Sequence, residues 1–170
     1  YPIGKFEMKD SYTPEETEKN IAAIDILPDT LGAAIAGLND EQINTQYREG
    51  GWTVRQVIHH LADSHMNAYI RTKKMLTEDD PEIMGYNQDA WANSADTLET
   101  DIDISVSLLT MLHHRWVILL RSVNSQDLKR TYRHPEYKQT YSLEQVIALY
   151  AWHGKHHVAH ISGLRYIKSW

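Results

Sequence analysis

The chain has 170 residues, a formal net charge of −6 at pH 7 and no cysteine. This length predicts a single domain over residues 1–170, large enough to bury roughly two thirds of the surface of its unfolded chain. The missing cysteine excludes disulfides, thiolate metal sites and a cysteine nucleophile. The negative charge argues against nucleic acid as a partner, because phosphate binding depends on clustered lysine and arginine.

The distribution of apolar residues along the sequence predicts where the protein is located in the cell. No apolar run approaches the roughly 20 residues that span a bilayer, and no basic segment followed by an apolar stretch resembles a secretion signal. We therefore expect a soluble cytoplasmic protein with no membrane partner. Ten histidines are the unusual part of the composition, and their positions on the predicted helices decide what they could do.

The first predicted helix begins at Thr13, where a threonine cap, Pro14 and Glu16 form a helix start. Pro28 interrupts this helix, and because proline removes a backbone hydrogen bond we expect a kink or short break there. Apolar residues spaced by three and four predict a face directed at the core: Ile21, Ile24, Leu27, Leu31, Ile35 and Leu38.

A second helix is predicted from about residue 53 to residue 75, after a turn at Gly50 and Gly51. Its apolar face is broad and carries Val54, Val57, Ile58, Leu61 and Ala68. Beside that face lies a polar stripe that could line a cavity or meet water, made by His60, Asp63, Ser64 and Asn67.

Residues 76–100 are predicted to be a long connection, of the kind that often serves as a lid or crossover, with a weak helical signal around Trp91. Residues 124–141 are predicted to form an irregular loop or a small hairpin. Between these segments, apolar spacing predicts a third helix through Ile104, Leu108, Leu112, Trp116, Leu119 and Val123.

The last helix is predicted to open at Ser142, with Gln145 completing a capping box, and to run nearly to Trp170. Two histidines, His153 and His157, lie within its apolar stripe. Four amphipathic stretches and one long connection predict an all-α four-helix bundle, whose core is a common place for metal sites built from facing helices.

The last helix offers two histidine pairs spaced by four residues. The direction of the apolar face favours His153 and His157, since His156 points well away from that face. Two imidazoles spaced in this way can share one divalent ion. A third ligand would have to come from the second helix, where periodicity places His65 nearest the core and His60 on its flank.

A simpler interpretation of each buried histidine is a hydrogen-bonded core residue, and this interpretation comes first for His113, His114 and His134. The sequence has no H-E-x-x-H pair, no G-x-S-x-G turn and no phosphate-binding glycine loop. The metalloprotease helix and the serine-hydrolase elbow are therefore absent.

Two long runs resemble the YfiT-like branch of the DinB superfamily: residues 50–67, GGWTVRQVIHHLADSHMN, and residues 150–160, YAWHGKHHVAH. Tyr1-Pro-Ile-Gly and His134-Pro135 extend the resemblance to nearly the whole chain. It implies a bundle in up-down-down-up order and one divalent ion per chain, with zinc or nickel favoured. The ligands carried over are His60, His153 and His157, of which His60 rests on the resemblance alone. Relatives are usually homodimers, which makes a homodimer the expectation here.

Three imidazole ligands leave a coordination position free for water or substrate. A divalent ion there would lower the pKa of bound water from 15.7 toward about 7, which predicts hydrolysis of a small-molecule substrate. One alternative is an S-transferase using a low-molecular-weight thiol of the bacillithiol type, with the ion stabilising a thiolate. Another is a non-catalytic metal-binding or dimerising module.

Three further residues are candidates for supporting catalysis. Asp63 and Asn67 could orient a ligand imidazole or a water molecule, because ligating histidines commonly donate their second N–H to an acceptor. An exposed polar stripe is the alternative for this pair. His134 could transfer protons if its loop folds over the site.

Overall fold

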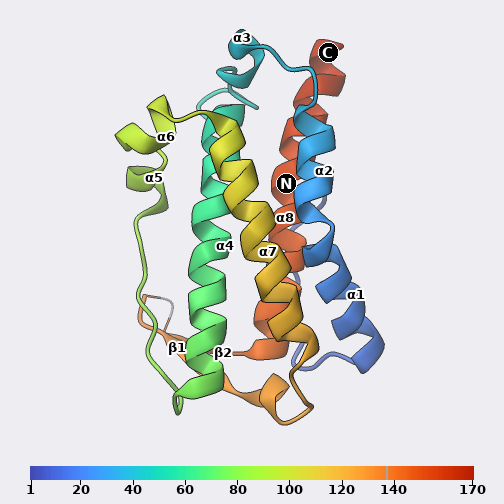
Figure 1. Ribbon diagram of the computed structural model, residues 1–170, viewed down its shortest axis with the longest axis vertical. Coiled ribbons are helices and arrows are strands. Elements are labelled where there is room, and N and C mark those ends of the chain that lie inside the picture. The colour runs from blue at the N-terminus through green and yellow to red at the C-terminus, as the bar shows by residue number, and fades with distance from the viewer. Residues whose placement is uncertain (137) are drawn as a thin grey trace.

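The computed structural model describes residues 1–136 and 138–170. Its main body is a bundle of long helices: α1 Pro14–Asp25 continued by α2 Leu27–Ile35, then α4 Val54–Thr77, α7 Ile102–Arg121 and α8 Leu143–Lys168. The chain rises through α1 and α2, descends α4, returns along a crossover, descends α7 and rises again through α8 (Figure 1). The up-down-down-up four-helix bundle is therefore confirmed.

The first arm of the bundle is broken where the sequence predicts it. Thr13 and Glu16 form a capping box at the start of α1. The helix stops at Asp25, and Pro28 occupies the first turn of α2, where a missing N–H costs no hydrogen bond. Two short helices instead of one let this arm follow α7 and α8, which it packs against.

The two helices that carry the key histidines both begin with a capping box. Thr53 and Gln56 exchange side-chain and backbone hydrogen bonds at the start of α4, and Ser142 and Gln145 do so at the start of α8. Gly50, with a φ of 65°, makes the turn that leads into α4. These caps fix the residue at which each helix begins. The starting residue in turn sets the direction in which each later side chain projects from the helix.

The connection between α4 and α7 is more regular than predicted, because it contains α5 Gln88–Trp91 and α6 Ala95–Glu99. Another short helix, α3 Asp40–Ile43, precedes α4 and was not predicted. Between α7 and α8 lie the 3₁₀ turn η1 Asp127–Lys129 and an antiparallel hairpin, β1 Thr131–His134 and β2 Gln139–Ser142, with Tyr132 opposite Tyr141. The hairpin alternative is thus correct, and it adds a small sheet to the helical fold.

Two buried apolar clusters fill the bundle. One surrounds the fully buried Trp116, whose indole N–H donates to the Thr72 hydroxyl at 3.1 Å. The other lies among α2, α4, α7 and α8, around Leu31 and Ile58. At Gly154 the helices approach so closely that a β-carbon would lie 2.6 Å from the Leu27 side chain. Glycine therefore lets α8 pack tightly against α2 next to His153.

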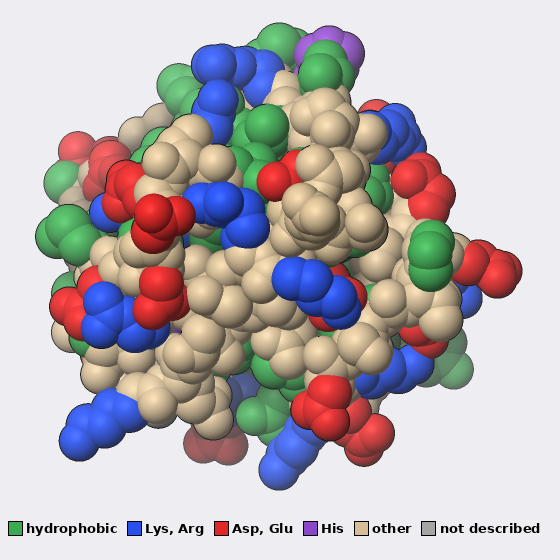
Figure 2. Space-filling model, turned by 90° about the horizontal axis from the view of Figure 1, so that it is seen from below, with side chains coloured by type: hydrophobic (Ala, Val, Ile, Leu, Met, Phe, Trp, Pro, Cys, Tyr) green, Lys and Arg blue, Asp and Glu red, His purple; other side chains and the backbone are tan. Residues whose placement is uncertain are grey.

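Charged side chains of both signs lie on the surface (Figure 2). At the end of the bundle seen in Figure 2, basic and acidic side chains are interspersed. No helix among the described residues is long and apolar enough to cross a membrane. Along α7, apolar side chains remain exposed at Ile104, Leu108, Met111 and Ile118. A second copy of the chain could cover them, and the homodimer stays a prediction.

Candidate metal centre

Three of the predicted site residues meet inside the bundle. His60 comes from α4, and His153 and His157 come from successive turns of α8; one ring nitrogen of each lies within 4.8 Å of the others. The Nε2 atoms of His60 and His153 are 3.2 Å apart. Among the described residues, this is the one group of three or more histidine or acidic side chains close enough to hold an ion.

Burial keeps these rings neutral. It lowers the pKa of His60 to about 4. It also lowers the pKa values of His153 and His157 well below 6.5, and the neighbouring histidines lower them further. At neutral pH each imidazole therefore offers an unprotonated nitrogen, the form that binds divalent cations.

A chain of hydrogen bonds behind His153 sets which of its nitrogens carries the proton. The Ile24 carbonyl can only accept, so Nδ1 of His113 must donate to it, at 2.6 Å. The Nε2 of neutral His113 then accepts from Nδ1 of His65 at 2.9 Å. The Nε2 of His65 in turn accepts from Nδ1 of His153 at 3.2 Å. The same backbone carbonyl thus assigns three tautomers in series.

This assignment leaves the lone pair of His153 on Nε2, the nitrogen that faces His60. His65 and His113 are both buried, and burial lowers the pKa values of both rings, that of His113 to about 4. The core interpretation of His113 is confirmed. His65, which periodicity places nearest the core, is the ring that orients His153 from behind, a role that the sequence does not reveal.

The remaining member of the trio has an unsatisfied atom. Nδ1 of His157 is buried and has no hydrogen-bond partner in the described part of the chain. Trp52 covers this side, with ring centroids 4.7 Å from His60 and 6.4 Å from His157. Buried polar atoms are normally paired, so an unpaired imidazole nitrogen beside two other neutral imidazoles fits a cation.

The trio lies between two hollows. A cavity of about 470 Å³ reaches His153 and is bounded by α4, the crossover, the hairpin and α8; Arg71, His134 and Tyr150 are among its lining residues. A smaller hollow, about 260 Å³, reaches His60 and His157 from the side of Trp52. A larger hollow, about 640 Å³, lies at α2 and the start of α7 and touches none of these histidines. The first cavity and the smaller hollow are therefore the two approaches to the trio that these hollows provide.

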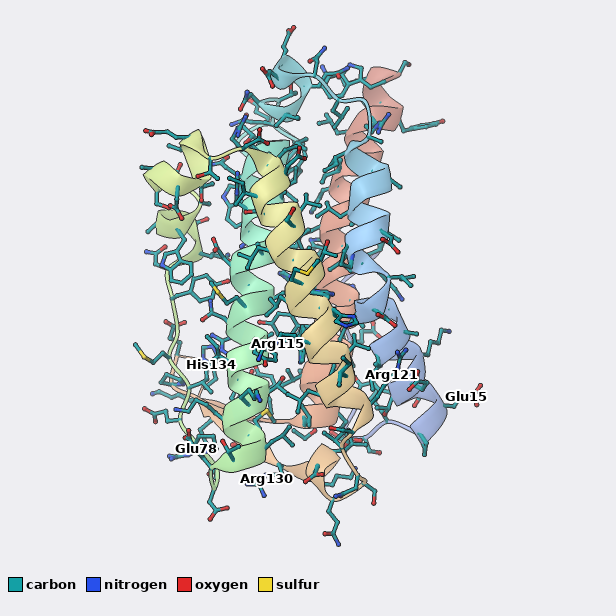
Figure 3. All side chains as sticks on the ribbon, viewed as in Figure 1. Glu15, Glu78, Arg115, Arg121, Arg130 and His134 are labelled. Carbon is teal, nitrogen blue, oxygen red and sulfur yellow. The ribbon has the colours of Figure 1, made fainter. Side chains whose placement is uncertain are left out.

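The other predicted residues differ in their placement. His134 lies on β1 beside the crossover (Figure 3) and lines the same cavity as His153. The shared cavity supports its role in proton transfer, which remains a prediction. Asn67 donates to the backbone carbonyl of Asp63. Burial, and secondarily Asp96, raises the pKa of Asp63 to about 6. No hydrogen bond in the described residues joins Asp63 or Asn67 to the trio, so their orienting role stays a prediction.

The first interpretation of His114, a buried core residue, is wrong. His114 is exposed. Its neighbour His113 faces inward, and a turn of about 100° per residue directs the next side chain outward. On α7 only the first of these two adjacent histidines therefore lies in the core.

The hydrogen-bonded chain gives a testable expectation for His65. Replacing it with leucine removes the acceptor behind His153 and should weaken binding of a divalent ion by roughly 10- to 100-fold. His65→Gln keeps an acceptor near the position of Nε2 and should recover most of that loss. Competition against a chelating dye measures both affinities. Equal affinity in the leucine variant and the parent would show that His65 does not orient the ligand.

Comparison with known proteins agrees with this geometry. A family model described as the DinB superfamily matches residues 23–161. A protein of Geobacillus thermodenitrificans named "Putative metal-dependent hydrolase" is 51% identical over 170 residues, which are all of this chain and 96% of the relative. The Bacillus subtilis protein named "Putative metal-dependent hydrolase YfiT" is 45% identical, again over all of this chain and 96% of its own length.

A solved structure matches the fold. It is that of YfiT from Bacillus subtilis, described as a probable metal-dependent hydrolase with an unusual four-helix bundle topology. The match has a TM-score of 0.98 at 45% sequence identity and covers all of this chain and 97% of that one. The bundle and its helix order are therefore those of a known structure.

Proposed function

Because the chain belongs to the DinB superfamily, we propose that it is a metal-dependent enzyme that holds one divalent ion on His60, His153 and His157. The observation that carries the proposal is the convergence of three neutral imidazoles from two helices within 4.8 Å. Two relatives carry the name "Putative metal-dependent hydrolase", which supports the same assignment. Zinc and nickel are the ions we favour, since both accept imidazole nitrogen.

The reaction we propose is hydrolysis of a small molecule that enters the 470 Å³ cavity. A divalent ion held by His60, His153 and His157 would supply an activated water as the nucleophile near neutral pH. The chain contributes the rest. Trp52 shields His60 and His157 on one side, and His65 holds the His153 ring in place. Asp63, with a pKa of about 6, is able to exchange a proton near neutral pH.

The test separates hydrolysis from thiol transfer. The ion-loaded protein is incubated with a panel of small esters and amides, and separately with an electrophile and low-molecular-weight thiols. We expect hydrolysis without any thiol, its loss after chelation and its return when zinc or nickel is restored. A conjugate that forms only when thiol is present would reject hydrolysis in favour of the transferase. Ion binding without either reaction would favour the non-catalytic module.

A further inference from the structure

Arg71 carries a buried charge that forms no ion pair with any residue the structure describes. It lies on α4 with 8% of its surface exposed. Its two hydrogen bonds go to neutral oxygens, the Tyr150 hydroxyl at 3.4 Å and the Met84 carbonyl at 3.0 Å. None of the ion pairs among the described residues includes it. A guanidinium in this state is unusual, because buried charges are normally paired.

The guanidinium has bonding capacity left. It has five N–H donors in a rigid fork, and only two of them donate to a residue in the described part of the chain. It lines the 470 Å³ cavity, so a molecule in the cavity can reach it. A planar fork of this kind matches a carboxylate through two parallel hydrogen bonds.

The rest of the cavity wall favours one negative charge over two. Burial raises the pKa of Tyr86 to about 12, so its phenol stays protonated and can donate a hydrogen bond. Tyr150 and Ser64 add neutral hydroxyls, and Leu149 adds an apolar surface. Glu136 also lines the cavity and would repel additional negative charge. A cavity wall with one arginine and one glutamate suits a monocarboxylate better than a phosphate dianion.

The position of Arg71 relates this site to the histidine trio. Its partner Tyr150 precedes His153 by three residues on α8, with ring centroids 5.6 Å apart. A carboxylate on Arg71 would therefore lie about one to two helical turns, roughly 5 to 10 Å, from the trio. This distance suits a compact molecule whose reacting group is a few bonds from its carboxylate.

From these observations we propose that Arg71 binds the carboxylate of a small monocarboxylic acid, which the cavity holds with its other end toward His153. That this molecule is the substrate rests on the proposed function. That the cavity binds a carboxylate does not, because Arg71 and its surroundings are complete without an ion on the trio.

The test uses the ion-free protein, so that a carboxylate cannot bind through the ion. The probes are acetate, hexanoate and benzoate, with benzamide as the neutral analogue of benzoate and phenyl phosphate as the dianion; calorimetry measures binding. We expect at least one of the carboxylates to bind. If benzoate binds, its affinity should exceed that of benzamide at least tenfold. Arg71→Met should lose this preference, and Arg71→Lys, which keeps the charge but not the fork, should weaken binding severalfold.

Matched variants separate the possible failures. His157→Ala should bind the carboxylate as the parent does, so loss of the ion site and loss of the carboxylate site are distinguishable. No carboxylate binding at millimolar concentrations, unchanged binding in folded Arg71→Met and Arg71→Lys, or preference for phenyl phosphate would each overturn the proposal. Binding only after Glu136→Gln would also overturn it, because Glu136 would then be the partner of Arg71 in solution.

Discussion

Replacing His157 with alanine is expected to leave the purified protein almost free of divalent ion, while the parent holds about one per chain after loading and dialysis. His157 supplies one of three ligand nitrogens within 4.8 Å of one another. Losing a ligand should cost more affinity than the roughly 10- to 100-fold lost with an outer hydrogen-bond partner. Elemental analysis by mass spectrometry gives the ion content of each protein directly.

The matched control is His114→Ala, since His114 is exposed and lies outside the trio. This variant should retain the full ion content of the parent, which would show that histidine removal alone is not the cause. Circular dichroism of both variants checks that the helices are intact. If folded His157→Ala carries as much ion as the parent, the assignment of the trio is wrong.

The second large effect is acid destabilisation of the ion-free protein. Unfolded histidines titrate near 6.5, whereas the folded pKa values of His60 and His113 are about 4. Between these values the unfolded chain binds more protons, so the free energy of unfolding falls as pH falls below about 6.5. By pH 4 each of these histidines should have lowered the free energy of unfolding by about 3 kcal/mol. Each tenfold rise in proton concentration between the two pKa values lowers it by about 1.36 kcal/mol.

Such a loss is large beside the total stability of about 5 to 15 kcal/mol that is usual for a domain. Urea unfolding followed by circular dichroism, in the presence of a chelator and at several values between pH 7.5 and pH 4.5, measures it. His113→Asn keeps a donor for the Ile24 carbonyl but removes one titrating ring, so the pH slope should fall by about one proton. The control is His114→Asn, which makes the same substitution at the exposed neighbouring residue. A stability that does not change over this range would contradict the buried, neutral state of the histidines.

Local signals in the sequence predict the helices well. The predicted caps at Thr13 and Ser142 act within one turn of the chain, and each is formed in the structure. The break at Pro28 follows from the chemistry of one residue. The short helices α3, α5 and α6 have four or five residues each, too few for a period of 3.6 to be recognised.

The site is predictable in part, for a related reason. His153 and His157 lie on one face of one helix, so periodicity predicts their proximity. The choice between His60 and His65 is different, because both are buried, at 5% and 0% exposure. The spacing of apolar residues predicts which side chains of a helix are buried. Metal ligation depends instead on where a ring nitrogen points once α4 and α8 are packed together. The resemblance to relatives supplied His60, and the structure alone gives His65 its place behind His153.

Arg71 could not be selected from the sequence at all. On a helical pattern it is one of several basic residues near the end of α4. Its burial depends on the crossover, whose Met84 carbonyl accepts from it, and on Tyr150 of α8. Such a site depends on segments far apart in the chain, which composition and spacing do not report.

Anomalous diffraction from crystals grown with zinc, recorded on both sides of the zinc absorption edge, tests the histidine trio most directly. We predict one anomalous peak per chain, bonded to a ring nitrogen of His60, His153 and His157 at about 2.0 to 2.1 Å, with at least one position left for a non-protein ligand. A peak on the neighbouring pair His156 and His160, whose Nε2 atoms are 3.1 Å apart, or a zinc with four protein ligands would contradict the account.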